Sequence, residues 1–439
     1  MWPRPHWPLR EESVVSAAGS TGVAGVRPDG WSPRARPPWV SALNHVGGVL
    51  GPEVLVPLDE ESLVAAAVQV AGLDDFGPDD SWREPFKLLV ADINAEANLN
   101  LVGRILSRFE LVRALTTLLR MADRERRHPE VLDSAVNEPV FITGMGRTGT
   151  TILHELMGQD PQLRAPRGYE LRYPVPGLQG EDRRGRIADV AAEISLWEAV
   201  IPELMPIHEM ADEGPDEDSV GEALGFVSQV WMATHRVPNF DLWMSMSGWP
   251  NAFAFLRRVL RHLQWQQPPK RWLLKGIYLA GLPHLFAEFP DARIVMTHRD
   301  PLSVLPSTVN LLATIRWQRT DRLDYQEIAA PVGMGVPFLF DIVVDWRERG
   351  VVPDDRFIDV RFADLMADHL AVIAGVYDWL GLTLTDSAAD AMRAHLKAKP
   401  RARHGAPTYR FSDLGIDEAA TRQAVARYVN RFDIPEEKM

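Results

Sequence analysis

Apolar residues recur with two different periods along the chain. Between about residues 60 and 128 they follow a helical repeat, which predicts helices with one buried face. The segment NLNLVGRILSRFELVRALTTLLRM places the following apolar residues on one such face: Val102, Ile105, Leu106, Phe109, Val112, Leu115, Leu118 and Leu119. After residue 138 the pattern changes to short apolar runs, namely EPVFITG, RWLLKG at 271, ARIVMTH at 292 and RFIDVRF at 356. Short runs of this kind are typical of strands buried on both faces of a parallel sheet.

This alternation of strands and helices predicts an α/β fold. We expect a three-layer protein with a P-loop-type parallel sheet flanked by helices, and with a helical N-terminal extension. Residues 1–40 mix Pro, Arg, Trp and Gly without periodicity and are predicted to be a flexible lead. Residues 41–135 then form the helical extension, and residues 136–439 form the P-loop α/β domain.

Composition narrows the classes of function. The net charge of −13 argues against a nucleic-acid or anionic-membrane surface. The lack of cysteine excludes disulfides, thiolate metal sites and cysteine nucleophiles. The N-terminus lacks the apolar core of a signal peptide, and the weakly charged stretch 329–346 looks too short to span a bilayer. We therefore expect a cytoplasmic protein without a membrane span, and the oligomeric state stays open, a homo-oligomer included.

The stretch FITGMGRTGTT at 141–151 carries the first chemical signal. A glycine-rich turn between a strand and a helix directs backbone N–H groups and the positive end of the helix dipole at one small volume, which suits a phosphate or sulfate. Thr150 stands where nucleotide hydrolases and kinases carry a lysine, whereas Arg147 can supply positive charge from within the loop. The loop is therefore predicted to hold a group with less charge than a triphosphate, without a metal. The hydroxyl donors of this loop are Thr148, Thr150 and Thr151.

Two motifs resemble those of a known family. GMGRTGTT is similar to the 5′-phosphosulfate loop of the sulfotransferases, which use 3′-phosphoadenosine 5′-phosphosulfate (PAPS). ARIVMTHRDPLSVLPS resembles their second signature, in which an arginine at a strand end and a serine eight residues later hold the 3′-phosphate. Arg299 and Ser307 have this spacing. The resemblance extends over roughly residues 85–435 and is strongest to the bacterial group with a helical N-terminal extension.

The resemblance implies a reaction and a set of site residues. A sulfuryl group would pass from PAPS to a hydroxyl or amine of a small-molecule acceptor, leaving the 3′,5′-bisphosphate PAP, without a metal. Glu170 is the first candidate for the base that takes the acceptor proton, and His208 is its rival. Lys275, at a strand end, is the candidate for bridging the sulfate and the leaving phosphate. The residues expected to bind the cofactor are Gly146, Arg147, Thr148, Gly149, Thr150, Thr151, Arg299, Ser307, Arg403 and Gly405.

Other interpretations of these residues stay open. Glu170 could pair with Arg172, and Asp300 could cap a helix that begins at Pro301. The acidic run ADEGPDEDS at 211–219 is interpreted as a solvated loop or helix start. The chain could also be a P-loop kinase-like phosphotransferase or a non-catalytic nucleotide-binding protein. The aromatic and methionine residues that could line an acceptor pocket, but are expected mostly in the core, are Trp197, Trp231, Trp243, Trp249, Met244 and Met246.

Overall fold

A five-stranded parallel sheet forms the centre of the C-terminal part of the protein. The computed structural model describes residues 33–177, 183–399 and 410–437. The strand order is β2-β3-β1-β4-β5, with every neighbouring pair parallel. The strands are β1 (Val140–Thr143), β2 (Leu163–Arg164), β3 (Arg271–Lys275), β4 (Arg293–His298) and β5 (Phe357–Arg361). Four of them coincide with the predicted apolar runs, whereas β2 is too short for any pattern to reveal it.

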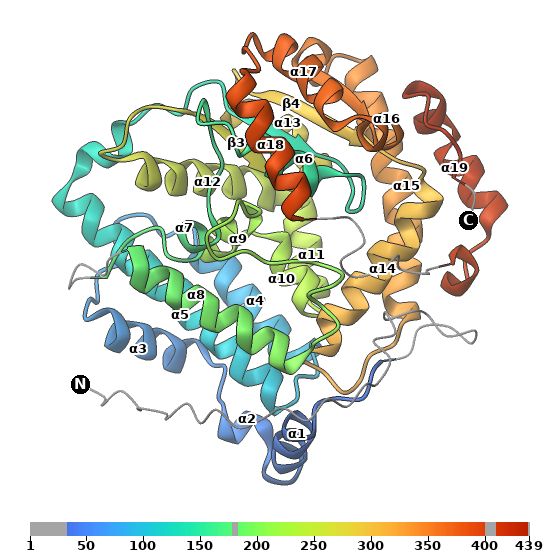
Figure 1. Ribbon diagram of the computed structural model, residues 1–439. Helices are drawn as coiled ribbons and strands as arrows, with labels where there is room; N and C mark the ends of the chain where they lie inside the picture. Colours follow the sequence, from blue (N-terminus) through green and yellow to red (C-terminus); the bar gives the residue numbers. More distant parts are fainter. Residues whose placement is uncertain (1–32, 178–182, 400–409, 438–439) are drawn as a thin grey trace, which may run out of the picture.

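Side chains of the strands alternate between two apolar layers. In β1, Val140 and Ile142 pack with α6, α17 and α18 on one face of the sheet. Phe141 points to the opposite face, into the larger core that also contains Leu274 of β3 and Ile294 of β4. Figure 1 shows α17 and α18 at the top of the molecule and the N-terminal helices at the bottom. Helices on both faces explain why the strands are apolar throughout rather than alternately polar.

Helices make up most of the remaining chain. Those before the sheet are α1 (Pro38–Leu50), α2 (Pro52–Leu55), α3 (Glu60–Ala71), α4 (Arg83–Glu96), α5 (Leu101–Arg127) and η1 (Pro129–Asp133). Those between β1 and β3 are α6 (Thr150–Met157), α7 (Gly168–Arg172), α8 (Arg183–Val200), α9 (Ser219–Glu222), η2 (Ala223–Gly225), α10 (Gln229–Thr234), α11 (Pro238–Trp243), η3 (Met244–Gly248) and α12 (Trp249–Gln264). Those after β3 are η4 (Leu279–Gly281), α13 (Leu282–Glu288), α14 (Pro301–Trp317), α15 (Gln326–Glu348), η5 (Asp354–Arg356), α16 (Phe362–Ala367), α17 (His369–Leu380), α18 (Asp386–Ala398), η6 (Phe411–Leu414) and α19 (Glu418–Arg431).

The N-terminal helices confirm the predicted helical extension, with one correction. In α5, Leu106 and Leu115 are buried as expected, but Ile105 and Phe109 are 42% and 46% exposed. Polar side chains occupy part of the buried surface instead, because Glu110 pairs with Arg319 of the segment after α14 at 2.7 Å. One continuous core joins these helices to the sheet domain. The division of the chain into separate units near residue 135 therefore stays a prediction.

Helix α15 changes one expectation. It is 23 residues long, and by length and composition it could cross a bilayer, although the stretch within it looked too short. About half of its most apolar part (44%) is buried inside the protein, and the helix packs against α14 and α19. Core helices of soluble proteins have the same character. The absence of a membrane span therefore stays a prediction.

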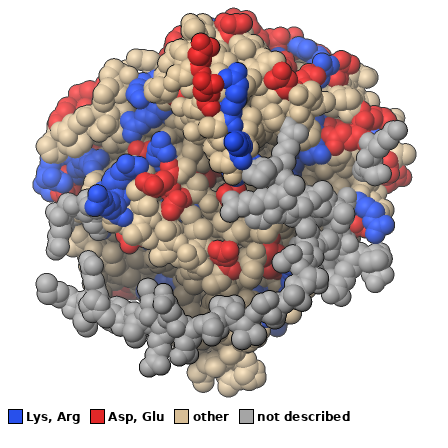
Figure 2. Space-filling model, in the orientation of Figure 1, with Lys and Arg blue, Asp and Glu red and all other residues tan. Residues whose placement is uncertain are grey.

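Charged side chains of both signs are interspersed over the surface seen in Figure 2. The lobe at the bottom of that view, formed by α1 and α2, shows no charged side chain on this side. Helix α1 itself contains no acidic or basic residue other than His45, and Val49 is 70% exposed.

Candidate active site

The loop between β1 and α6 has the backbone of a phosphate cradle. Gly144 has a φ of 148°, and a Cβ placed there would lie 2.4 Å from Thr297 Oγ1, so only glycine fits. Gly149 has a φ of 94° and caps the N-terminus of α6. The first amides of α6 therefore open toward the loop at the end of the sheet where strands β1, β3 and β4 all terminate.

The threonine hydroxyls of the loop have different roles. Thr148 Oγ1 donates to Met145 O at 2.6 Å and lies 2.6 Å from Thr297 Oγ1 in β4, so it braces the loop against the sheet. Thr150 is buried at the start of α6. Thr151 is exposed, and its Oγ1 accepts a hydrogen bond from Lys275 at 3.1 Å. Thr151 is therefore the hydroxyl that connects the loop to a cation.

Lys275 lies at the end of β3 and is only 6% exposed. Its ammonium contacts Thr151 on one side and the Glu217 carboxylate on the other. Burial alone would raise the pKa of Glu217, but Lys275 and then His208 outweigh burial and hold this pKa at about 2. Glu217 is therefore ionised at neutral pH and compensates the charge of a buried lysine.

The acidic run at 211–219 leads into α9, as the helix-start alternative predicted, but Asp216 and Asp218 are buried rather than solvated. Asp216 pairs with Arg172 at 2.8 Å, and Asp218 accepts a hydrogen bond from the Tyr278 hydroxyl in the protein interior. Burial raises the pKa of Asp218 to about 7. Sequence reasoning missed Glu217 because a run of acids usually lies in solvent; the available signal was that a lysine ending an apolar strand needs a buried anion.

A second cationic point lies at the end of β4. Arg299 Nη1 donates to the backbone O of Arg147 at 2.9 Å, which joins the two predicted motifs directly. Its guanidinium lies 4.2 Å from the ring centroid of Phe362, and its Nε and Nη2 contact Glu437 near the C-terminus. Asp300 caps α14, as expected, by accepting from Leu302 N at 3.0 Å.

Ser307, about two turns into α14, is a buried polar group without a hydrogen-bond partner in the described part of the chain. The residue is 5% exposed, and its Oγ has no hydrogen-bond partner among the residues that the structure describes. Buried hydroxyls are normally hydrogen-bonded. An unpaired one at this position therefore suits a polar ligand.

These features agree with the comparisons to known proteins. The model of a family described as "Sulfotransferase family" matches residues 139–386, which is more than half of the chain. The chain belongs to the sulfotransferase family. Its matched region contains the β1–α6 loop, Glu217, Lys275, Arg299 and Ser307.

Similar mycobacterial proteins support this membership. Omega-hydroxy-beta-dihydromenaquinone-9 sulfotransferase Stf3 of Mycobacterium bovis is 26% identical over 267 residues, covering 56% of this sulfotransferase-family chain and 63% of Stf3. The match thus spans less than two thirds of that relative. The crystal structure of sulfotransferase STF1 from Mycobacterium tuberculosis H37Rv is 29% identical, with a TM-score of 0.72, covering 84% of this chain and 98% of STF1. Sulfotransferase STF9 from Mycobacterium avium is 28% identical, with a TM-score of 0.76, covering 87% of this chain and 98% of STF9.

The two predicted bases lie in different surroundings in this sulfotransferase-family protein. Glu170 accepts from Arg164 at 3.2 Å and from the backbone N of Arg167 at 3.0 Å, so its carboxylate caps the short helix α7. No contact within the described residues joins Glu170 to Lys275. His208 lies close enough to Glu217 to lower the pKa of that carboxyl.

The remaining cofactor-binding candidates lie either in the loop after β1 or outside the described residues. Arg147 has a φ of 70° and donates to the backbone O of Ile207 at 3.3 Å, which ties the loop to the segment before His208. Gly146 has open space where a side chain would lie. Arg403 and Gly405 lie outside the described residues.

The aromatic residues considered for an acceptor pocket are mostly core residues, as expected. Trp231, Trp249 and Met244 are buried, and Met246 is 76% exposed. Trp197 and Trp243 are partly buried against the core.

Proposed function

We propose that this protein transfers a sulfuryl group from PAPS to a hydroxyl group of a small-molecule acceptor. The observation that carries the proposal is the position of Lys275, whose ammonium joins the loop hydroxyl of Thr151 to the carboxylate of Glu217. A cation, an anion cradle and an ionised carboxylate thus meet at one edge of the sheet. The name of Stf3, which refers to a hydroxylated menaquinone derivative, supports a hydroxyl acceptor.

The residues present suit the two charged ends of PAPS. The loop amides and Arg147 would hold the 5′-phosphosulfate, and Arg299 with Ser307 would hold the 3′-phosphate. The Ser307 hydroxyl, which has no hydrogen-bond partner among the described residues, and the open space at Gly146 are the structural support for this fit. When bound, PAPS would supply the sulfuryl group and a bisphosphate leaving group.

Lys275 is proposed to stabilise charge on the leaving group. Its ammonium is largely buried, so its interaction with an anion is stronger than in water, and its contact with Thr151 fixes it beside the loop. The positive φ of Arg147 and its hydrogen bond to the backbone O of Ile207 hold a second cation in the loop after β1, at the same edge of the sheet as Lys275.

Glu217 is our proposed base, in place of Glu170. Glu170 is engaged in capping α7, whereas Glu217 contacts the lysine of the site. While Lys275 stays beside it, the Glu217 carboxylate is a weak base, because its pKa is held at about 2. A ligand oxygen that engages Lys275 weakens this pairing and raises the proton affinity of Glu217 when the acceptor proton must leave. His208 is the rival base.

Nucleotide selectivity tests the cofactor assignment. Calorimetry should show PAP binding far more tightly than 5′-AMP, and Arg299→Ala should remove most of the difference, because the arginine fork is the proposed partner of the 3′-phosphate. Equal affinities of the unmutated protein for the two nucleotides would refute the assignment.

Turnover tests the base. With radiolabelled PAPS and a panel of phenolic and aliphatic alcohols, Glu217→Gln should lower transfer by roughly 10²- to 10⁴-fold while PAP affinity changes little. Glu170→Gln is the matched control and should leave the transfer rate within a few-fold. A severe loss in His208→Ala with a mild loss in Glu217→Gln would move the base to His208, and a severe loss in Glu170→Gln would restore the original assignment.

A further inference from the structure

The proposed 3′-phosphate arginine already holds an anion that belongs to the protein. Nε of Arg299 donates to Glu437 Oε1 and Nη2 donates to Oε2, each at 2.7 Å. The backbone N of Glu437 also donates to Asp300 Oδ2 at 2.9 Å. Glu437 lies 138 residues after Arg299 in the sequence, so this contact depends on how the C-terminal segment folds back on the sheet.

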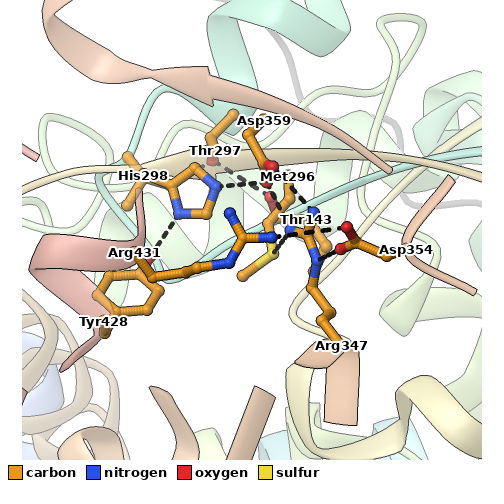
Figure 3. Close-up of polar contacts among 10 residues, drawn as sticks. Thr143, Met296, Thr297, His298, Arg347, Asp354, Asp359, Tyr428 and Arg431 are labelled. Atoms are coloured by element: carbon orange, nitrogen blue, oxygen red, sulfur yellow. Dashed lines mark hydrogen bonds and ion pairs between the residues drawn. The ribbon is translucent and has the colours of Figure 1, made fainter. Parts of the chain in front are cut away.

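The segment before Glu437 is firmly attached beside Arg299. His298, the residue preceding Arg299, is hydrogen-bonded through both ring nitrogens. Its Nδ1 lies 2.7 Å from the Tyr428 hydroxyl of α19, and its Nε2 lies 2.9 Å from Asp359 Oδ1 (Figure 3). The ring of Phe432 stacks on His298 at 4.1 Å between centroids, and Ile434 is buried. The anchor ends at Ile434, and only the last residues before Glu437 cross to the arginine.

The contact has the form that a phosphate would use. An arginine fork binds one carboxylate or one phosphate through two parallel hydrogen bonds. A second anion at the same edge of the guanidinium would be repelled by the first. Glu437 and a nucleotide phosphate are thus mutually exclusive partners of this edge of Arg299.

We propose that Glu437 is an internal competitor for the 3′-phosphate at Arg299, so that residues 435–437 must leave the arginine when the nucleotide binds. The inference rests on the proposed function, because it takes the 3′-phosphate as the ligand of Arg299. The C-terminal tail then acts as an autoinhibitory contact that sets the nucleotide affinity.

The contact is weak enough to be displaced. The side chains of Glu437 and Arg299 are 31% and 22% exposed, so solvent screens their attraction in part. Displacement does not require α19 to unfold, because the contacts of Tyr428, Phe432 and Ile434 lie upstream of the residues that move. We expect removal of the competing charge to tighten PAP binding by about 3- to 10-fold.

Glu436 offers a matched control one residue away. Its carboxylate faces Arg422 of α19 at 3.4 Å instead of Arg299. Calorimetry on the full chain should show that Glu437→Gln binds PAP about 3- to 10-fold more tightly, whereas Glu436→Gln binds it like the unmutated protein. Affinity for 5′-AMP, which has no 3′-phosphate, should stay the same in all three proteins. A general structural effect of the substitution would change both nucleotides alike.

Hydrogen exchange gives an independent measurement on the unmutated protein. PAP should speed amide exchange in the peptide containing residues 435–437, because the Glu437 N–H leaves Asp300, whereas 5′-AMP should not. If PAP affinity is the same in Glu437→Gln as in the unmutated protein while both still prefer PAP to AMP, the competition is refuted and the proposed function survives. If neither protein prefers PAP to AMP, the proposed function fails and the competition fails with it. Slower exchange of the tail in PAP would also overturn the inference.

Discussion

Replacement of Glu217 by glutamine should destabilise the protein in a way that depends on pH. The substitution preserves size but removes the negative charge beside Lys275, which is 6% exposed. The pKa of Glu217 falls from an ordinary 4.5 to about 2, because the cations beside the carboxyl outweigh its burial. A shift of this size corresponds to about 3 kcal/mol of preference for the charged form in the folded protein. Since the Glu217 side chain is 25% exposed, we expect a loss of about 2 to 3 kcal/mol at pH 7.

The sign of the pH dependence follows from the direction of the shift. A carboxyl whose folded-state pKa is depressed contributes stability that is complete above its unfolded-state pKa and is lost as pH falls through the folded-state value. For Glu217 this window runs from about pH 4.5 down to about pH 2. The difference in unfolding free energy between the unmutated protein and Glu217→Gln should therefore shrink by about 1 kcal/mol between pH 7 and pH 3.5.

Urea unfolding followed by tryptophan fluorescence measures this difference at each pH. Glu213→Gln is a suitable control, because Glu213 lies in the same segment but its side chain is 53% exposed in an ion pair with Arg183. The control should change stability by less than about 1 kcal/mol at any pH. A Glu217→Gln penalty below about 0.5 kcal/mol at pH 7, or one that stays constant down to pH 3.5, would refute the buried pairing with Lys275.

Three further outcomes are expected. Gly144→Ala should lower stability by about 2 to 4 kcal/mol and weaken PAP binding, because the new Cβ would lie 2.4 Å from Thr297 Oγ1. Gly146→Ala, which has open space for its Cβ, should change stability little, and equal stabilities of the two variants by thermal denaturation would contradict the cradle geometry. Burial, and then the charge of Lys275, lower the pKa of His154 to about 3, so its imidazole should be neutral at pH 5 and an imidazolium NMR signal at that pH would refute this expectation. The contribution of His154 to stability, which is complete above about pH 6.5, should fall as pH drops below that value. Sulfuryl transfer should persist in excess chelator, and activity that only magnesium restores would favour the kinase-like alternative.

Local patterns in the sequence were enough to predict the fold and the glycine-rich loop between β1 and α6. The strands β1, β3, β4 and β5 are apolar runs because helices cover both faces of the sheet. Each strand can therefore be recognised from its own sequence, without knowledge of its neighbours in the sheet. The loop after β1 is also local, since such a turn needs particular residues at fixed offsets, whereas the roles of Arg299 and Ser307 were implied by the resemblance of their spacing to the second sulfotransferase motif. The strand-end position of Lys275 could be predicted from the local pattern.

Partners that lie far apart in the chain were decided only by the tertiary structure. Glu217 lies in an acidic run whose composition is typical of a solvated loop, yet the fold pairs it with Lys275, 58 residues later in the sequence. Glu437 reaches Arg299 only because α19 packs on His298. A carboxylate can be hydrated at the surface or paired with a cation inside the protein, and its sequence neighbours do not reveal which of these environments it has. Glu170 was a candidate base because of the family resemblance, and only the tertiary structure shows that its carboxylate caps α7 and pairs with Arg164; its role as a base stays a prediction.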